Sequence, residues 1–456
     1  FVVVSDCMAD TDTARLAHVR LPATGWGEKN GTVTNSERMV SRQRPFLPPA
    51  GEAKADWRII AEVAAGMGHG AAFGWTGPAA VFREYAAMTG LARQRGLKLD
   101  LTARADISDE AYDTLEPFRW GEGDLLAGGF SFPDRRARII DVAPLAAPAI
   151  DPAFPLRLNT GRYRDQWHTM TRTGLSARLA KHRPEPLVEV HPADAAAAGV
   201  TDGGLARIVT PRGATVLRVR VTDAQGRGTI FAPMHWSDLF ASGGRTNRLT
   251  SPAHDPVSGQ PGFKDCAAAL APVVPEWRAF LVTTGEPAAA DALYWARVRQ
   301  AKGWLVEMAG MGEGPLDSVL PAGRRLEAED MRRGMKRIAV LGDDGRLAAA
   351  MFVTRNGELP PREWIVAQLD KDGANEAELL AGRPAAARPD PGPQVCVCFD
   401  VGLNAILAAI AQQRLANVEA IGRALNAGTN CGSCRPQLGA ILRETTISEM
   451  TAEAAE

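Results

Sequence analysis

Strand-like and helix-like patches of apolar residues alternate over residues 1–145, which is typical of an α/β region. The clearest helical pattern runs from Asp56 to Met67, where apolar residues recur at helical spacing and Asp56 is placed to act as the N-cap. The chain opens on the β-branched apolar run Phe1–Val4, which predicts a buried strand. Residues 22–44 are polar and rich in glycine, and this composition predicts a long functional loop without regular structure.

The pattern changes to short apolar runs between turn signals over residues 150–275. Pro192–Ala198 predicts a short helix, because proline occupies its first position and Gly199 follows its end. Several short strands at this spacing predict a β-barrel. The predicted strands are Leu156–Thr160, Leu187–His191, Leu205–Thr210, Thr215–Val221 and Gly228–Pro233.

The remainder divides into a connector of unknown role, residues 276–385, and a small C-terminal module, residues 394–445. Residues 286–300 of the connector predict a helix, and Ile338–Val353 predicts a hairpin around Asp343-Asp344-Gly345. Proline and glycine in residues 383–393 predict a linker. The module contains three helical patterns, at 403–413, 418–425 and 436–442.

Composition and charge narrow the class of protein. Hydrophobic residues make up 45% and charged residues 23% of the 456 residues, and the formal net charge is −1, as in an ordinary globular protein. This charge balance gives no electrostatic footprint for nucleic acid. The sequence contains no run of 18 uncharged apolar residues and does not begin with a basic leader, so we expect no membrane span and a cytoplasmic location.

Four of the six cysteines are confined to the C-terminal module, as Cys396-Val-Cys398 and, after 32 residues, Cys431-Gly-Ser-Cys434. Two thiolate pairs joined by a helical hairpin can hold a tetrahedral zinc ion or a 2Fe-2S cluster, or they can be reduced core thiols. The small residues around Cys431 let backbone N–H groups approach cluster sulfurs, which favours iron and sulfur. The module resembles the bacterioferritin-associated-ferredoxin-like 2Fe-2S domain, and the resemblance makes all four cysteines cluster ligands.

Further strings lie outside the module. They are Val4-Ser5-Asp6, Leu21-Pro22-Ala23, Glu28-Lys29-Asn30-Gly31, Asn35-Ser36-Glu37-Arg38, the decapeptide Thr160–Thr169, Pro233–Trp236, Asn247–Thr250 and Asp255-Pro256 leading to Phe263-Lys264. Together they resemble the C-terminal half of a molybdopterin-guanine-dinucleotide oxidoreductase of the dimethyl-sulfoxide-reductase superfamily. With the appended module, the assimilatory nitrate reductase branch is the most similar. This resemblance implies an α/β portion, then a six-stranded double-psi-type β-barrel, then a small helical 2Fe-2S domain.

The decapeptide supplies the groups that a doubly phosphorylated pterin ligand needs. Gly161 allows close approach of the backbone, Arg162 and Arg164 can meet phosphate, and amide, imidazole and hydroxyl groups follow. So many polar groups in one run would be costly to bury without a ligand. By resemblance the whole block contacts the dinucleotides: Thr160, Gly161, Arg162, Tyr163, Arg164, Asp165, Gln166, Trp167, His168 and Thr169.

The resemblance also implies contacts outside the decapeptide: Ser5, Asp6, Lys29 and Asp56 with a guanosine end, and Asn247, Lys264 and His235 with the pterin system. Each has a structural alternative. Ser5 and Asp6 fit a strand-to-turn cap, Asp56 fits an N-cap, and Lys29 fits a solvated loop side chain. We interpret Cys7 and Cys266 as small core residues, Trp167 and Trp236 as packing residues beside the site, and His182 and His191 as ordinary surface or turn histidines.

The resemblance implies an oxidoreductase that reduces nitrate to nitrite in nitrogen assimilation. Molybdenum bis(molybdopterin guanine dinucleotide) would be its cofactor, and a flavoprotein, ferredoxin or flavodoxin would deliver electrons to the 2Fe-2S cluster. The molybdenum-ligating cysteine and the 4Fe-4S motif of the family have no counterpart in these residues, and the chain starts on a strand without methionine. We therefore expect a fragment, incomplete and inactive alone. A formate-dehydrogenase-like enzyme and a non-enzymatic 2Fe-2S electron-transfer protein are the alternatives.

Overall fold

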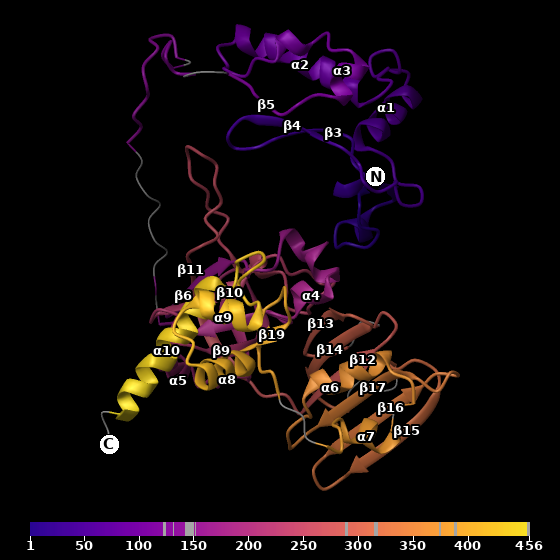
Figure 1. Cartoon of the computed structure of the whole chain (residues 1–456), viewed down its shortest axis with the longest axis vertical. Helices are drawn as coiled ribbons and strands as arrows, with labels where there is room; N and C mark the ends of the chain where they lie inside the picture. Colours follow the sequence, from indigo (N-terminus) through magenta and orange to yellow (C-terminus); the bar gives the residue numbers. More distant parts are fainter. Residues whose placement is uncertain are drawn as a thin grey trace. The chain divides into compact units, whose positions relative to one another are not determined.

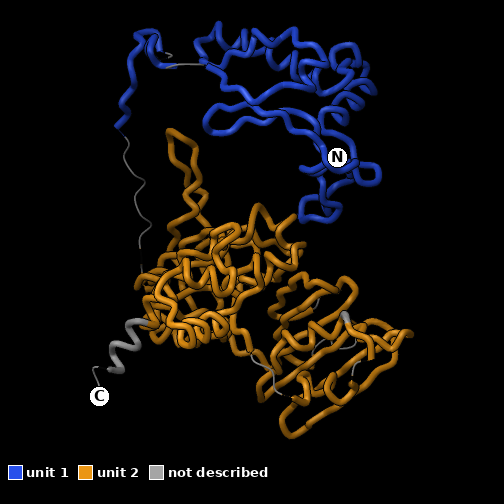
Figure 2. The backbone as a smooth tube through the Cα atoms, viewed as in Figure 1, with its two compact units in different colours: residues 1–144 blue, residues 145–456 orange. Residues whose placement is uncertain are grey.

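The computed structural model describes residues 1–121, 125–130, 132–141, 150, 152–287, 291–313, 318–373, 375–386 and 390–453. The chain forms two compact units, Phe1–Pro144 and Leu145–Glu456 (Figure 2). Each unit has apolar cores of its own. The predicted boundary after residue 145, and Pro389 of the predicted linker, lie outside the described residues.

Unit 1 combines two small sheets with three helices. β1 (Val3–Asp6) pairs in parallel with β2 (Val19–Pro22), and β3 (Gly31–Thr34), β4 (Met39–Gln43) and β5 (Phe118–Arg119) form an antiparallel sheet. The helices are α1 (Asp56–Gly66), α2 (Pro78–Gln94) and α3 (Asp109–Asp113). Phe82 of α2 packs against Tyr112 of α3 in the small core of this unit.

Three expectations about unit 1 are wrong. Residues 22–44 contain the hairpin β3–β4, since backbone pairing along Thr32–Val33 and Arg42–Ser41 satisfies a segment of low apolar content. Ala55 is the N-cap of α1, and Asp56 is its first helical residue. β1 is not a buried strand: Val3 is 51% exposed, because β2 is its partner on one side and its side chains face no packed layer.

Unit 2 begins with a closed six-stranded β-barrel, which confirms the expected fold. The strand order around the barrel is β10-β6-β11-β8-β9-β7, and the pairs β6–β10 and β7–β9 are parallel. Apolar residues that alternate along each strand fill the interior, among them Leu158, Ile208, Leu217 and Ile230. The strands are β6 (Leu156–Gly161), β7 (Leu187–Val190), β8 (Leu205–Thr210), β9 (Gly213–Val221), β10 (Thr229–Pro233) and β11 (Cys266–Val273).

The loops and helices of the barrel agree in part with the sequence. α5 (Pro192–Ala198) has the predicted bounds, and Gly199 ends it in the left-handed conformation with φ of 68°. Cys266 is buried in the barrel core as predicted, whereas Cys7 of unit 1 is exposed. A short helix, α4 (Ala177–Ala180), lies between β6 and β7.

The connector is a six-stranded antiparallel sheet with the order β13-β14-β12-β17-β16-β15 (Figure 1). The predicted hairpin is present as β16 and β17, but residues 294–300 form β13 and not a helix. Tyr294, Ala296 and Val298 are buried alternately, as a strand with one packed face requires. The strands are β12 (Trp277–Thr283), β13 (Tyr294–Gln300), β14 (Gly303–Gly310), β15 (Arg324–Asp330), β16 (Met335–Leu341) and β17 (Leu347–Thr354); α6 (Arg362–Val366) and α7 (Glu376–Ala381) pack on one face.

A buried ionic cluster joins the connector to the barrel. Glu185, before β7, accepts hydrogen bonds from Arg218 of β9 at 2.8 Å and from the hydroxyl of Tyr294 at 2.5 Å. Glu307 of β14 accepts two hydrogen bonds from Arg362, at 2.7 and 2.9 Å. Burial raises the pKa of Glu185, and the charge of Arg218 opposes that rise. Nη2 of Arg218 also lies 3.9 Å from Oε2 of Glu307, so the cluster links the barrel to the connector.

The C-terminal module consists of a two-stranded ribbon and three helices. β18 (Gln394–Cys396) pairs with β19 (Val401–Gly402), and α8 (Leu403–Gln413), α9 (Val418–Leu425) and α10 (Arg435–Glu453) follow. α8 and α9 have the predicted bounds. Their apolar faces, with Leu438 of α10, enclose a small core that includes Cys396 and Cys434.

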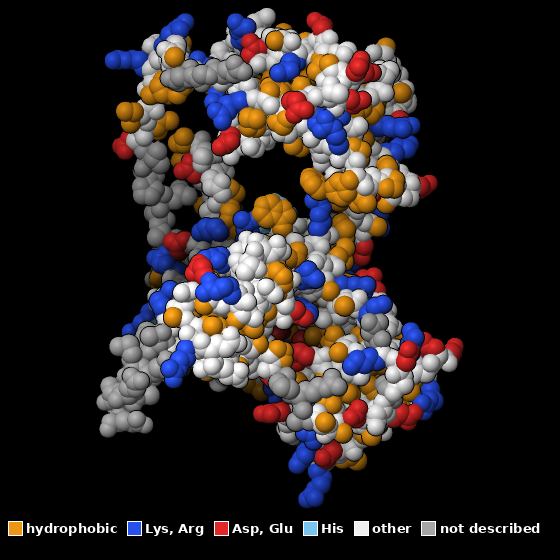
Figure 3. All heavy atoms as spheres, viewed as in Figure 1, with side chains coloured by type: hydrophobic (Ala, Val, Ile, Leu, Met, Phe, Trp, Pro, Cys, Tyr) orange, Lys and Arg blue, Asp and Glu red, His pale blue; other side chains and the backbone are white. Residues whose placement is uncertain are grey.

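The surface shows no region of a single charge on the face seen in Figure 3, where basic and acidic side chains are interspersed. Among the described residues, no helix combines the length and the apolar character that crossing a bilayer requires.

Candidate functional site

The parallel pairing of β6 and β10 brings two chain segments to one end of the barrel. Gly161 is opposite Pro233 in the register, and the amide of Met234 donates to the carbonyl of Gly161 at 2.6 Å. A Cβ atom at Gly161 would lie 2.8 Å from the ring of Phe231, so glycine is needed there for close packing. The decapeptide and the segment after β10 therefore leave the barrel side by side.

Basic and aromatic side chains form the exposed face of these segments. The guanidinium of Arg162 lies 4.6 Å from the ring centroid of Trp167, which in turn contacts His168 at 4.3 Å between ring centroids. The rings of His168 and His235 are 5.7 Å apart, and the Nζ atom of Lys264 donates to the carbonyl of Thr160 at 2.5 Å. Cations beside open aromatic faces suit a ligand that is both anionic and aromatic.

Electrostatics at this face match an anion site. The pKa of His235 is lowered by partial burial and then by the neighbouring His168, Arg162 and Lys264. Positive charges thus repel one another here, and an anionic ligand would relieve that repulsion. Trp167, at 49% exposure, belongs to this open face and is not the packing residue expected, whereas Trp236 is buried at 3%.

The opposite side of the decapeptide anchors it to the barrel. The hydroxyl of Thr160 donates to the carbonyl of Phe263 at 2.6 Å, and the hydroxyl of Tyr163 accepts from the amide of Leu187 at 3.1 Å. Burial raises the pKa of Tyr163, so the phenol stays protonated. Tyr163 and Met170 pack in a core with Trp236 and Phe240. These buried contacts fix the position of the decapeptide, and with it the exposed face formed by Arg162, Trp167 and His168.

Gln166 stands apart from the other buried groups of the decapeptide. It is 3% exposed, yet neither atom of its side-chain amide has a hydrogen-bond partner among the described residues. The indole nitrogen of Trp236 is in the same condition. Unpaired buried polar atoms cost free energy, so these groups fit a hydrogen-bonding ligand or water at the site.

The backbone is strained at the same place. His168, Thr169, Met170 and His235 all have positive φ, of 20°, 52°, 56° and 76°. Residues with a Cβ atom adopt this region rarely, and such strain concentrates at functional sites. The geometry therefore makes the end of the barrel, where these residues lie, the candidate ligand site. Asn247, also predicted to contact the pterin, is exposed in the short 3₁₀ turn Thr246–Leu249.

Arg164 and Asp165 face in a third direction, toward the C-terminal module. Arg164 is predicted to meet phosphate, but its guanidinium donates to Asp165, to Oε1 of Gln437 at 3.2 Å and to the carbonyl of Val395 at 3.2 Å. Asp165 also pairs with Nδ1 of His182 at 3.1 Å. His182 is thus a largely buried partner in this network and not an ordinary surface histidine, whereas His191 caps α5 by accepting from Ala193.

The cluster cysteines lie on two loops at one end of the module. The Sγ atoms of Cys398 and Cys431 are 3.3 Å apart, and Cys396 neighbours Cys434 in the core of the module. Among the described residues no three potential ligands gather around a point suited to one metal ion. Two thiol pairs fit a two-iron cluster, in which each iron is held by two thiolates.

The local backbone explains how these loops approach a cluster. Gly428 and Gly432, on either side of Cys431, have φ of 80° and 73°, a left-handed conformation that glycine adopts without strain. Burial and the neighbouring Cys396 raise the pKa of Cys434 to about 11, while hydrogen bonds from Ser433 and Cys398 lower the pKa of Cys431. Burial thus disfavours the thiolate form of Cys434, and a bound metal would stabilise that form.

The predicted residues of unit 1 form two separate groups. Asp6 at the end of β1 accepts from the amide of Met8 at 3.0 Å, with Ser5 beside it on the strand. Lys29 pairs with Asp56 at 2.6 Å, and both side chains are partly exposed. The sequence did not indicate that Lys29 and Asp56 meet. Their guanosine contacts stay predictions.

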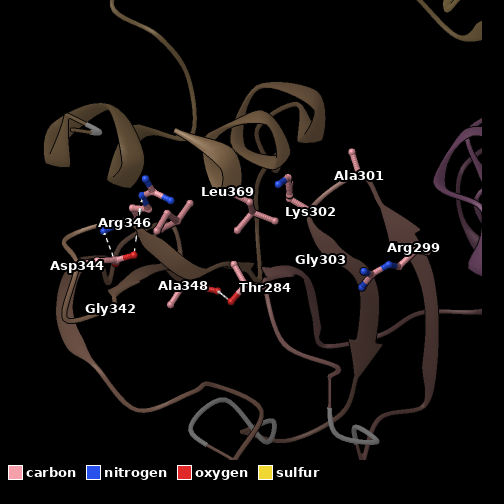
Figure 4. A pocket seen from close by; sticks show the side chains of 11 residues that line it. Thr284, Arg299, Ala301, Lys302, Gly303, Gly342, Asp344, Arg346, Ala348 and Leu369 are labelled. Carbon is pink, nitrogen blue, oxygen red and sulfur yellow. Dashed lines mark hydrogen bonds and ion pairs between the residues drawn. The ribbon is translucent and has the colours of Figure 1, made fainter. Parts of the chain in front are cut away.

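A cavity of about 500 Å³ lies in the connector, and none of its lining residues is a predicted site residue (Figure 4). Arg346, which lines it, pairs with Asp344 and Asp372. Arg299 lies over the ring of Trp304, 5.3 Å from its centroid. The cations of this cavity are thus engaged within the connector.

Comparisons with known families agree with this arrangement. Residues 156–267 match the molydopterin dinucleotide binding domain, residues 1–65 match the molybdopterin oxidoreductase domain, and residues 394–444 match the BFD-like [2Fe-2S] binding domain. The first match covers the barrel with its decapeptide, and the third covers the four cysteines. The third match supports a 2Fe-2S cluster in this module over zinc or a set of core thiols, and the four cysteines as its ligands stay a prediction.

Curated relatives point the same way. A nitrate reductase of Klebsiella oxytoca is 41% identical over 97% of this chain and 52% of its own length. The assimilatory nitrate reductase catalytic subunit of Bacillus subtilis is 33% identical over 58% of this chain and 37% of its own length. Formate dehydrogenase 1 subunit alpha of Methanococcus maripaludis is 32% identical over 57% of this chain and 37% of its own length. The chain spans about half the length, or less, of these relatives.

Proposed function

Because the chain belongs to the molybdopterin oxidoreductases and carries a 2Fe-2S domain, we propose that it is part of an assimilatory nitrate reductase. The reaction is the reduction of nitrate to nitrite and water, which consumes two electrons and two protons. The electrons enter through the 2Fe-2S cluster. The cofactor is the bis(molybdopterin guanine dinucleotide) form of molybdenum, the enzyme is cytoplasmic, and the electron donor is a flavoprotein, a ferredoxin or a flavodoxin.

One observation carries this proposal. The C-terminal module lies directly against the decapeptide Thr160–Thr169, here called the dinucleotide loop, through the hydrogen bonds of Arg164 with Gln437 and Val395. A cluster held at that loop is placed to exchange electrons with a cofactor bound there. The likeness to the Klebsiella oxytoca nitrate reductase extends over 97% of the chain, against 57% for the formate dehydrogenase. The coverage and identity of this one relative support nitrate over formate, since the Bacillus subtilis nitrate reductase and the formate dehydrogenase match nearly equal shares of the chain, 58% and 57%.

The residues of this chain bind and orient, and the molybdenum cofactor supplies the oxygen-atom and two-electron chemistry when it is bound. Arg162 and Lys264 offer charge for pyrophosphate, and Trp167 offers a ring face for an aromatic part of the ligand. The amide of Gln166 fits a pterin or ribose edge, because it lacks a partner in the part of the chain that the structure describes. Thr160 and Tyr163 fix the loop that presents these groups.

Metal analysis and activity on the purified holoenzyme test the function. We expect both iron and molybdenum, and nitrate reduction with reduced viologen as the electron source. Formate oxidation without nitrate reduction would assign the chain to the formate branch. Iron without molybdenum would instead indicate an electron-transfer protein, and either result would overturn the proposal.

A further inference from the structure

Arg164 is the residue of the decapeptide with the most contacts to another domain. Its guanidinium is 21% exposed and donates from Nε and Nη2 to Asp165, at 3.0 and 2.9 Å. The remaining donors reach the module: Nη1 to Gln437 and Nη2 to the carbonyl of Val395, both at 3.2 Å. One planar group thus bridges the dinucleotide loop and the 2Fe-2S domain.

Both partners in the module are next to cluster ligands. Val395 precedes Cys396 on β18, and Gln437 follows Cys434 by three residues in the first turn of α10. Arg164 therefore holds both of the ligand-bearing segments at once. A movement of either segment away from the loop would break one of these hydrogen bonds.

A second contact supports the same docking. Lys181 pairs with Asp400 at 2.7 Å, and Asp400 lies two residues after Cys398. Lys181 precedes His182, which binds Asp165 and so belongs to the Arg164 network. Among the described residues, Arg162, Trp167 and His168 make no such contacts with the module. One set of decapeptide side chains therefore faces the candidate dinucleotide site, and another set contacts the 2Fe-2S domain.

We propose that Arg164 is a positioning residue for electron transfer, which docks the 2Fe-2S domain on the dinucleotide loop and raises the reduction potential of the cluster through its charge. A fixed positive charge stabilises the reduced cluster, because reduction adds one negative charge nearby. The negative charge of Asp165 offsets part of this effect, and its hydrogen bonds with Arg164 hold the guanidinium in this orientation. The inference rests on the cluster of the proposed function but not on nitrate as its substrate.

The first test measures the cluster itself, in the 456-residue chain with its cluster reconstituted from iron and sulfide. In an EPR-monitored redox titration, Arg164→Gln should lower the reduced-to-oxidised ratio at a fixed potential about tenfold, or about 59 mV for one electron. Arg164→Lys keeps the charge and should stay near the parent value. Arg157→Gln is the control. Arg157 lies at the start of β6, pairs with Asp265 and, among the described residues, does not contact the module.

The second test separates docking from charge. In the holoenzyme, Gln437→Leu removes one hydrogen bond and no charge, so it should leave the potential unchanged. It should lower the turnover with reduced ferredoxin severalfold while turnover with reduced viologen is kept. If the Arg164→Gln chain does not take up a cluster, Arg164→Lys still tests the role of the charge through the potential of its cluster. Gln437→Leu still tests the docking role through the ferredoxin-linked rate.

Several results would overturn the inference. An unchanged potential in a cluster-loaded Arg164→Gln chain removes the electrostatic role, and an unchanged ferredoxin-linked rate in Gln437→Leu removes the docking role. Failure of the proposed function would look different, because the holoenzyme would then not reduce nitrate with any donor while the potential still responded to Arg164.

Discussion

The imidazole rings of His168 and His235 lie 5.7 Å apart, although the two residues belong to segments that leave different strands of the barrel. Both have positive φ, and both lie at the exposed end of the parallel pair β6–β10. Their proximity follows from the Gly161–Pro233 register. The pKa of His235 therefore responds to the charge of His168 and of the other cations nearby.

We expect His235 to titrate below its ordinary pKa of 6.5, because burial and the charges of His168, Arg162 and Lys264 disfavour its protonated form. The unfolded chain then takes up this proton at a higher pH than the folded chain. The contribution of His235 to stability is therefore complete above pH 6.5 and decreases as the pH falls below it. Lys264→Gln should raise the pKa in a histidine NMR titration, and Arg157→Gln should not. Titration of His235 at or above 6.5 would contradict the site.

Arg162→Ala should lower the molybdenum content of the holoenzyme. A hydrogen bond to a charged partner is worth about 1.5–3 kcal/mol, which predicts roughly 10- to 150-fold weaker retention of the dinucleotide. The measurement is the molybdenum-to-protein ratio after gel filtration. Arg157→Ala serves as the matched control, because Arg157 lies on β6, the strand that ends just before Arg162, and pairs with Asp265. Normal occupancy in Arg162→Ala would exclude a phosphate contact at this residue.

Cys431→Ser should abolish the visible absorption and the EPR signal of the cluster, since a two-iron cluster requires four thiolates. Turnover with reduced ferredoxin should be lost, while turnover with reduced viologen is kept. Cys266→Ser is the matched control, because Cys266 is buried in the barrel core and does not belong to the thiol pairs. Retention of ferredoxin-linked turnover without a cluster would show that electrons enter elsewhere.

The sequence predicted those parts of the fold in which local pattern and tertiary packing agree. α5, α8 and α9 have their predicted bounds: the side chains of His191 and Asn417 cap α5 and α9, and buried apolar residues line the inner face of α8. It failed at β13, where residues 294–300 were expected to be helical but Tyr294, Ala296 and Val298 alternate into a buried face. The packed layer there, and not propensity, determines the structure.

The candidate site was predictable as a block but not in its division of labour. The polar decapeptide marked the right segment, yet nothing in it distinguishes Arg162, which faces the open end of the barrel, from Arg164, which binds the module. The partner of Arg164 is Val395, 231 residues away along the chain. His182 was missed for the same reason, since its partner Asp165 is brought near only by the fold.

The buried ionic cluster between barrel and connector should contribute strongly to stability. Glu185→Ala removes the acceptor of the Tyr294 hydroxyl and the nearer carboxylate of Arg218, which is left with Glu307 at 3.9 Å, and breaking such a buried pair costs about 3–5 kcal/mol. Tyr294→Phe removes a hydrogen bond to a charged group and should cost about 1.5–3 kcal/mol. Both are measured as changes in the free energy of unfolding by urea.

Glu189→Ala is the matched control for Glu185→Ala, because Glu189 lies on the adjacent β7 and pairs with the more exposed Arg220 at 3.3 Å. An exposed pair of this kind contributes about 0–1 kcal/mol. Equal losses in the two variants would show that the cluster has no special role. A larger loss in Glu185→Ala, together with early unfolding of the connector in hydrogen exchange, would show that Glu185 fastens this domain to the barrel.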